Sequence, residues 1–476
     1  MQFNNNKDKK QKMWKMSFDS KFVKFQNSYN DFWKNHELIK KTIFTIVLLT
    51  IFVAAGTITI PGIHLVNQDS LNSGDFLGIL NLVGGGGLRN FSIVALGISP
   101  FITASLIMMI LQTKLFPPIY RLSQAGPQGR VKINIITRFL TLIFAITQSI
   151  VLTKALKNPT TGFGIRIIPE LDTNWYAYFL LPLILIAGSL FALFIGEHIT
   201  NKGVGNGTSL LIFAGIASSL IPTFKSAFLF FIPSLNGDSL ILKEILNFGV
   251  YLFGYLLVIF IVGYFYLAER RIPIQQVGAG LSKNEKELSY LPLKANPAGI
   301  MSVIFSLMFL SLPTMIAGLF NPATSSYYQW VYTHFQMTQA VGFWCFVVVT
   351  FFFTILMGLQ QSKIDKISED FAKNSTFIPG IRPGEQTEDY LIIKILNLSL
   401  FSSVYLILIG SMRYVEQMFG LPANIGYGGT GLMILVSVCI ETLQQIQARL
   451  KTQELSRKRK KILYSQIHGE EGDLLW

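Results

Sequence analysis

The sequence predicts an all-α membrane protein that crosses the bilayer ten times, and two observations carry this prediction. Ten apolar runs are each long enough for a helix to cross a hydrocarbon core of about 30 Å. The chain is 51% hydrophobic and 14% charged, whereas soluble domains carry about 25% charged residues. No segment is left over for a separate soluble domain.

The first 41 residues are expected to form a basic cytoplasmic segment rather than a cleaved signal peptide, because lysines interrupt its apolar positions. Its aromatic residues recur at steps of three or four, as on one face of a helix: Trp14, Phe18, Phe22, Phe25, Tyr29 and Phe32. This pattern favours an amphipathic helix on the inner membrane surface over a plain solvated arm.

The ten predicted spans follow in order along the rest of the chain. They cover residues 42–60, 92–112, 135–155, 175–199, 209–221, 248–267, 299–319, 339–359, 392–412 and 428–448. An even number of spans places both termini on one side of the membrane. That side carries 33 of the 40 Lys and Arg residues, so the positive-inside rule sets both termini in the cytoplasm.

The spans divide into two halves of five, residues 42–222 and 248–448, joined by an outer hinge loop at 223–247 and followed by a basic cytoplasmic tail at 449–476. An odd number of spans per half permits an inverted repeat with a pathway between the halves. This topology allows a transporter as readily as a channel. Apart from Glu441 in the last span, the cores of the spans hold no Asp, Glu, Lys or Arg away from their ends, which disfavours ion-coupled transport.

A run of four glycines, Gly84 to Gly87, lies on the outer side before the second span. Leu88, Arg89 and Asn90 follow it, whereas a Walker A loop requires Lys and then Ser or Thr after its last Gly. The apolar stretch 76–83 precedes the glycines. We expect a short re-entrant helix that ends in flexible glycine.

Enzyme and metal chemistry are disfavoured. Ser99 and Ser209 each follow a glycine within two residues, but His198 is the one histidine near a membrane level that could act as their general base. Packing of small residues between helices explains these serines better than an intramembrane protease does. The five histidines are scattered without metal-ligand spacing, so no metal or other cofactor is expected.

Six segments carry a resemblance to the SecY family, the channel-forming subunits of the Sec protein translocase. They are LGISPFITASLI (96–107), GEHITNKGVGNGTSLLIFAGIASSLIP (196–222), RRIPIQ (270–275), YLPLKANPAGIMSVIF (290–305), FIPGIRPGEQTEDYL (377–391) and GYGGTGLMILV (426–436). They occur in the family's order, over about residues 60–451, and together they are far more specific than any one of them.

The resemblance implies two five-helix halves around an hourglass pore, with no catalytic activity. Unfolded polypeptides would cross the plasma membrane through this pore. Membrane segments would leave sideways between the second and third spans on one side and the seventh and eighth on the other. Gln148 on the third span retains a polar lateral-gate position of the family. The segment at about 67–90 then corresponds to a plug, with the apolar residues Phe76, Leu77, Ile79, Leu80, Leu82 and Val83.

Matching motif by motif assigns the family's pore ring to six isoleucines. They are Ile98, Ile102, Ile212, Ile216, Ile304 and Ile434. The first four form two pairs with i, i+4 spacing, so each pair shares one helix face. A ring of aliphatic tips is poorly wetted by water and ions, and it offers no hydrogen bonds that would retain a passing chain.

Three arginines on the inner loops suit docking to an acidic protein surface or to RNA. Pro273 follows Arg270 and Arg271, and prolines flank Arg382 closely, so stiff loops present guanidinium groups that bind carboxylate or phosphate. In the family the matching loops receive the SecA ATPase and the ribosome. The resemblance further implies SecE-type and SecG-type subunits, signal peptides and nascent chains as partners, within the lipids of a bacterial plasma membrane.

The sequence departs from the family at several gate positions. A commonly polar position on the second span is Met109, and the motif at 301–305 reads MSVIF, which lacks the family's proline. These departures concern the polar gate network and the threshold for signal sequences. A secondary transporter remains the alternative function from another class, and an accessory member of the same family with few substrates also stays open.

Overall fold

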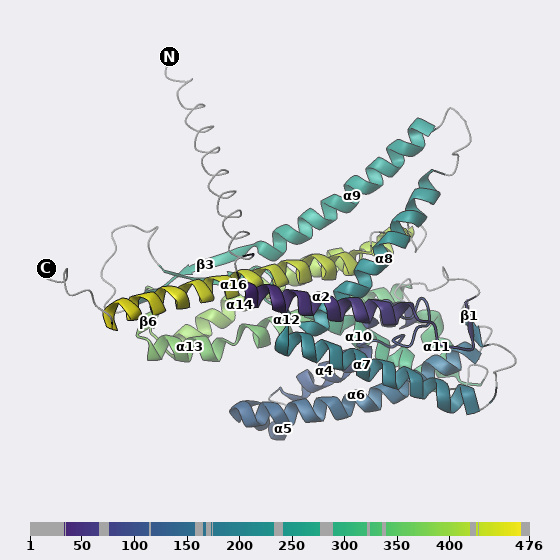
Figure 1. Ribbon diagram of the computed structural model, residues 1–476, viewed down its shortest axis with the longest axis horizontal. Coiled ribbons are helices and arrows are strands. Elements are labelled where there is room, and N and C mark those ends of the chain that lie inside the picture. The colour runs from purple at the N-terminus through teal and green to yellow at the C-terminus, as the bar shows by residue number, and fades with distance from the viewer. Residues whose placement is uncertain are drawn as a thin grey trace, which may run out of the picture.

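We describe the protein from a computed structural model, which places residues 33, 35–65, 76–113, 116–157, 165–167, 173, 175–232, 241–276, 289–320, 324–335, 339–418, 425–426 and 428–467. The predicted amphipathic helix at residues 14–32 lies outside these described residues, as does part of the predicted plug segment at 66–75. The described residues form an elongated bundle of helices (Figure 1).

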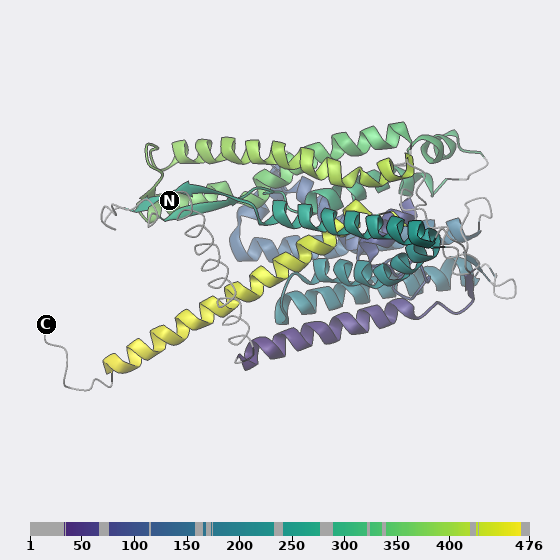
Figure 2. The ribbon, with the colours of Figure 1, turned by 90° about the horizontal axis from the view of Figure 1, so that it is seen from above.

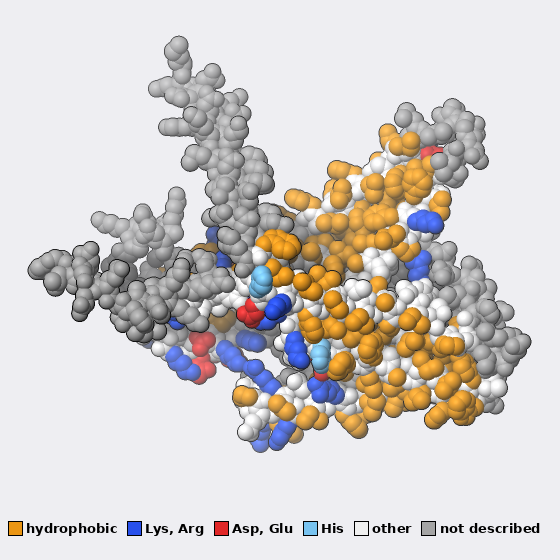
Figure 3. Space-filling model, viewed as in Figure 1, with side chains coloured by type: hydrophobic (Ala, Val, Ile, Leu, Met, Phe, Trp, Pro, Cys, Tyr) orange, Lys and Arg blue, Asp and Glu red, His pale blue; other side chains and the backbone are white. Residues whose placement is uncertain are grey.

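Eight helices in the described part of the chain are long and apolar enough to cross a membrane. They are α2 (His36–Thr57), α6 (Gly126–Lys157), α7 (Leu181–Lys202) with the π-helical turn η4 (Tyr176–Leu180) before it, α8 (Gly207–Phe231), α9 (Ile241–Leu267), α12 (Ala340–Ser362), α14 (Glu385–Gly410) and α16 (Gly429–Ile467). Each covers most or all of one of the predicted spans. Their apolar side chains cover much of the surface that Figure 3 shows, as expected for contact with lipid.

The other two predicted spans contain shorter apolar helices, α4 (Ser99–Leu111) and α10 (Met301–Ala317). With 13 and 17 residues, both fall short of the roughly 20 residues that a crossing needs. The two helices contact one another inside the bundle. Their buried position explains how short helices are accommodated, because helices around them provide the contact with lipid.

Five further helices and three strand pairs complete the described part of the chain. The helices are α3 (Phe76–Gly84), α5 (Pro117–Gln124), α11 (Ser326–His334), α13 (Ile364–Lys373) and α15 (Met412–Met418). The antiparallel pairs are β1 (Ile63–Leu65) with β2 (Ile165–Ile167), β3 (Glu269–Pro273) with β5 (Tyr290–Lys294), and β4 (Gln275–Gln276) with β6 (Thr376–Phe377). β1 and α11 lie at one end of the bundle, whereas β3, β6 and α13 lie at the other (Figure 1).

Local sequence explains where α8 and α4 begin. Asn206 precedes α8, and its side-chain oxygen accepts a hydrogen bond from the backbone N–H of Thr208 at 3.2 Å, which satisfies one of the donors left free at a helix start. Pro100 occupies the first turn of α4, where its missing N–H costs nothing. The loops before both helices therefore end at fixed points.

The start of the second span was predicted wrongly. The prediction began at Ser92, whereas α4 begins at Ser99. Residues 92–98 instead form turns, and the N–H of Ile93 donates to the carbonyl of Ile58 at 3.1 Å. These apolar residues surround α3, and hydropathy alone does not distinguish a buried turn from a helix.

The predicted outer hinge loop at 223–247 was also too long. Helix α8 continues through Pro222 to Phe231, and α9 already begins at Ile241. The proline removes one helical hydrogen bond, but Ala227 beyond it packs in a buried apolar cluster with Tyr251 of α9. This packing compensates for the interruption, so the proline does not end the helix.

The last helix is also longer than the apolar run that predicted it. The prediction ended the span at residue 448, whereas α16 continues for 39 residues to Ile467. Lys, Arg, Gln and Leu are good helix formers, and they dominate the segment after 448. Figure 2 shows α16 crossing the bundle obliquely and extending beyond it. The hydropathy boundary therefore marks the change from apolar to basic residues within one helix.

Candidate pore, plug and seam

The six isoleucines singled out in the sequence are all buried in the helix bundle. Ile98 precedes α4, and the others lie on α4, α8, α10 and α16. The most exposed is Ile216 at 8%, and all six belong to one large contiguous cluster of buried apolar side chains. Helices of both halves thus contribute aliphatic side chains to the same cluster.

Helix α3 packs beside this cluster and contacts α4, α8 and α10. Leu80 and Val83 are 1% and 0% exposed, and Leu82 is partly buried against the same apolar cluster. The expected short helix that ends in glycine is therefore present. The side chains of the other three predicted plug residues, Phe76, Leu77 and Ile79, lie outside the description.

The glycine loop after α3 folds back on the helix that it follows. The N–H of Gly86 donates to the carbonyl of Asn81 at 2.8 Å, and the N–H of Arg89 donates to the Asn81 side chain at 3.2 Å. Gly85 and Gly86 have φ values of +90° and +79°, a backbone region that other residues rarely adopt. Glycine at these two positions lets the chain reverse beside the pore cluster.

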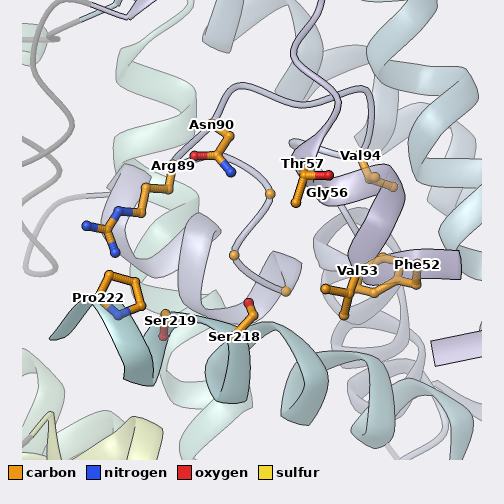
Figure 4. Close-up of a pocket in the computed structure, with 13 residues that line it drawn as sticks. Phe52, Val53, Gly56, Thr57, Arg89, Asn90, Val94, Ser218, Ser219 and Pro222 are labelled. Carbon is orange, nitrogen blue, oxygen red and sulfur yellow. The ribbon is translucent and has the colours of Figure 1, made fainter. Parts of the chain in front are cut away.

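A recess of about 220 Å³ lies between this loop, the end of α2 and α8. Figure 4 shows Arg89 and Asn90 on the loop side, Ser218 and Ser219 on α8, and Phe52 on α2. Sequence reasoning missed this recess, because its walls come from three segments that are distant along the chain. The recess leaves open space beside the glycine loop.

A buried polar contact joins α4 to α6 and reaches α10. The side chain of Gln148, 1% exposed, donates to the Thr103 hydroxyl at 3.3 Å and accepts from the Ser99 hydroxyl at 3.4 Å. The Thr103 hydroxyl lies 3.6 Å from the sulfur of Met308 on α10. We call the contact zone between α4 and α6 on one side and α10 on the other the seam.

The sequence identified Gln148 at this position but not its partners. Ser99 was weighed as a nucleophile, and the structure instead places its hydroxyl against Gln148 and Met308. Met109, the departure from a commonly polar residue, is 6% exposed and packs within the apolar pore cluster. Thr103 could have been found from its spacing of four residues after Ser99, which places both hydroxyls on one helix face.

A second contact joins α6 to the residues that follow α10, across one end of the seam. The ammonium group of Lys154 on α6 donates to the carbonyl oxygen of Leu319, two residues beyond α10, at 2.8 Å. Gly318 packs so closely here that a methyl group added to it would lie 2.6 Å from a Cγ atom of Val151. A cation at a helix C-terminus is stabilised by the partial negative charge there.

The predicted docking arginines Arg270 and Arg271 lie on strand β3, which pairs with β5. Arg271 forms an ion pair with Glu269 at 2.8 Å and lies 4.6 Å above the Tyr290 ring. The hydrogen bond that Arg271 donates to Glu269, and then the electrostatic interaction with Tyr290, raise the pKa of the Arg271 guanidinium. The sequence predicted a stiff loop here, and the stiffness comes from a hairpin as well as from proline.

Arg382 is exposed in a turn that is held from both sides. The hydroxyl of Thr387 donates to the Arg382 carbonyl at 2.8 Å, and Ser368 on α13 donates to the Gly384 carbonyl at 2.9 Å. Gly384 has φ +105°, which a residue with a side chain would adopt only under strain. The turn therefore presents the guanidinium outward from a fixed backbone.

The two arginine-bearing loops pack together as one unit. β4 pairs with β6, opposing Gln275 to Phe377. Beneath the strands, apolar side chains of both loops form a separate buried cluster: Ile272, Leu293, Ile364, Ile378, Leu391 and Ile395. Sequence reasoning treated the loops separately, since strands of two to five residues carry too little pattern to be detected.

At the same end of the bundle, α16 is tied to the first half of the chain. Arg449 donates to the Gly203 carbonyl at 2.9 Å, in the loop between α7 and α8. The neighbouring N–H of Val204 donates to the Thr45 hydroxyl on α2 at 3.0 Å. Gln453 donates to Glu37 at 3.3 Å and also accepts from Asn35. These contacts join the last helix to the first.

Comparison with known proteins gives one consistent match. The family model described as SecY matches residues 92–443. The chain is similar to the protein translocase subunit SecY of Mycoplasma capricolum, with 36% identity over 455 residues that cover 93% of each chain.

Two solved structures share the fold. The chain is similar to a SecY structure whose plug domain is described as stabilising the closed state and maintaining a membrane seal, with a TM-score of 0.58 and 18% identity. It is also similar to Sec61 in a canine ribosome-channel complex, with a TM-score of 0.56 and 17% identity. Each match covers 88% of this chain and 93% of the other.

Proposed function

The chain belongs to the SecY family, and from that membership we propose that it is the channel-forming subunit of a bacterial Sec translocase. It conducts unfolded polypeptides across the plasma membrane and releases membrane segments sideways into the bilayer. As a channel subunit it is expected to have no catalytic activity of its own. The observation that carries the proposal is the burial of six isoleucines from both halves in one cluster beside a re-entrant helix.

In this proposal the six isoleucines form the constriction of the pore. Their side chains are branched, apolar and free of hydrogen-bonding groups, so they close around a chain of any sequence without binding it. Water wets such a constriction poorly, which limits ion leakage. Helix α3, with Leu80 and Val83 buried beneath it, acts as the plug that covers the constriction in the resting channel.

The seam is proposed as the lateral exit. Its inner surface combines a polar contact centred on Gln148 with the soft thioether of Met308. A hydrophobic signal segment can displace Met308 at low cost, because the hydroxyls of Ser99 and Thr103 keep acceptors on their own side of the seam, the Gln148 side chain and the Ser99 carbonyl. The two halves, α2 to α8 and α9 to α16, would then part at this seam while remaining joined through residues 232–240.

The cytoplasmic unit of β3 to β6 and α13 is proposed as the docking surface for ribosomal RNA and for the SecA ATPase. Arg270, Arg271 and Arg382 lie on this unit, and the similar Sec61 structure is itself part of a ribosome-channel complex. Both chain termini then face the cytoplasm, in agreement with the excess of positive charge on this side.

The small subunits of the translocase are proposed to pack on the least covered helices. α2 and α9 are the two long helices with the smallest buried share within the described chain, 17% and 22%. A SecE-type helix lying across them would clasp both halves, since α2 belongs to one half and α9 to the other. A SecG-type subunit is the second partner expected.

Reconstitution tests the proposal directly. The chain, purified with its SecE-type subunit, is placed in vesicles together with SecA, ATP and an unfolded secretory precursor. We expect ATP-dependent protection of the precursor from added protease. If a SecY channel treated in parallel protects the precursor and this chain does not, the proposal of a general translocase is wrong. Complementation of cells depleted of their own SecY distinguishes a general channel from an accessory one.

A further inference from the structure

Backbone atoms of the plug loop and of a pore helix meet without any side chain between them. A Cβ atom added to Gly215 on α8 would lie 2.1 Å from both the carbonyl carbon and the oxygen of Gly85. One added to Gly86 would lie 3.2 Å from the carbonyl oxygen of Gly215. Separations below 3 Å do not occur between such atoms, so this contact requires glycine on α8.

The same close approach is found on the other side of the loop. A Cβ atom added to Gly97, just before α4, would lie 1.6 Å from the carbonyl oxygen of Gly84. The last residue of the plug helix and the first two of its loop are thus held between α8 and the start of α4. Contacts of this kind position a backbone sharply, because no flexible side chain can adjust to a shift.

Gly215 also links the plug to the proposed pore ring. It directly precedes Ile216, a ring member on the same helix. Gly431 on α16 lies close to both the plug and the proposed ring. A Cβ atom added to it would lie 3.7 Å from the Leu82 side chain and 3.9 Å from the Ile216 side chain. The plug helix therefore lies against the ring at a place lined by glycine.

We propose that Gly215 is the positioning residue that seats the plug on the pore ring. This inference rests on the proposed function, since it concerns the resting state of the same channel. The seated state depends on direct backbone contact between Gly215 and Gly85. Any side chain at position 215 would force the glycine loop away from α8 and lift the plug from Ile216.

The recess beside the loop determines what yields to an added methyl group. It borders Gly85, Gly86 and Gly87 and provides about 220 Å³ of open space. Alanine is a better helix former than glycine, so α8 itself accepts the change at Gly215. The loop is therefore displaced from α8, with the recess beside it leaving room for the glycines to rearrange, and overpacking of this size shifts a two-state equilibrium by roughly 5- to 150-fold.

The test is the variant Gly215→Ala, reconstituted with the SecE-type subunit into planar bilayers. We expect the resting ion conductance to rise about 10-fold or more, with unchanged abundance and elution of the purified complex. Gly249→Ala is the matched control, because no described atom lies within 4 Å of a Cβ atom added on helix α9. A resting conductance equal to that of the control would overturn the assignment.

A second pair of variants separates seating of the plug from damage to α8. In a channel that lacks residues 76–87, Gly215→Ala is expected to add no further conductance, because the group that it displaces is gone. Additional leakage in that background would show that the substitution distorts the pore helix itself. If removing residues 76–87 leaves the conductance of the parent unchanged, the plug of the proposed function is wrong, whatever Gly215 does.

Discussion

The ammonium group of Lys154 donates a hydrogen bond of 2.8 Å to the carbonyl oxygen of Leu319, and this bond joins α6 to the end of α10. The two residues are separated by the seam through which membrane segments are proposed to leave. The sequence gives no sign of this contact, since one residue is a cation near the end of a predicted span and the other is an apolar loop residue. Their contact holds the two sides of the seam together at this point.

Lys154→Met should weaken this closure. A cation at a helix terminus contributes about 0.3–1 kcal/mol, so the open seam should become roughly 2- to 5-fold more populated. Precursors with weakened signal sequences should then be translocated faster, as measured by protease protection in vesicles. Lys225→Met, an exposed cation on α8, serves as the control. Equal rates for the two variants would contradict a role for Lys154 in closure.

Substituting Ile304 and Ile434 together by Asn should make the resting channel leak. Two polar amides on opposite helices provide hydrogen-bonding sites that let water enter the constriction. Single-channel recordings in planar bilayers should show frequent openings without substrate. The double Leu variant keeps the apolar lining and should remain closed. Resting currents at the parent level in the Asn variant would argue against these isoleucines as the seal.

Arg382→Glu should abolish coupling to the motor without affecting insertion. The residue is exposed on a constrained turn, and reversing a charge at a docking contact costs about 2–5 kcal/mol, or about 30-fold to several thousand-fold in affinity. SecA-driven translocation should fall sharply at constant channel abundance. Arg121→Glu, on the inner helix α5, controls for loss of positive charge in general. Full activity of the Arg382 variant would identify it as a merely solvated charge.

The orientation of the chain can be tested with single cysteines in a variant lacking Cys345 and Cys439. A cysteine at Asn374 or Asn284 should be shielded from an impermeant thiol reagent in intact cells, whereas one at Ser325 should react. The proposed topology places Asn374 and Asn284 on the cytoplasmic side and Ser325 on the outer side. Labelling with the opposite pattern would invert the topology and the assignment of the docking arginines.

The ten apolar runs were enough to predict the helical architecture, because burial in lipid requires each crossing segment to be apolar and helical. They were less informative about where helices end. Pro222 lies inside α8 and basic residues continue α16 to Ile467, since a helix continues wherever packing or propensity supports it. The start of α4 at Ser99 depended on turns packed around the plug, which no hydropathy pattern reveals.

Six isoleucines and Gln148 were singled out from motifs, because each such residue carries its own sequence signal. All seven are buried, and their roles stay predictions. The partners of Gln148 and Lys154 were not found, because they lie 45 and 165 residues away along the chain. Contacts between backbones, such as that of Gly215 with Gly85, leave no side-chain pattern at all and become visible only in three dimensions.

The place of Ile434 on the last helix has a consequence for synthesis. A chain is made from its N-terminus, so four of the six ring isoleucines are complete when α8 has emerged, whereas α16 arrives last. Until then the proposed ring lacks Ile434, and Arg449 has not yet reached Gly203. We therefore expect that a chain whose synthesis stops before α16 encloses no complete constriction.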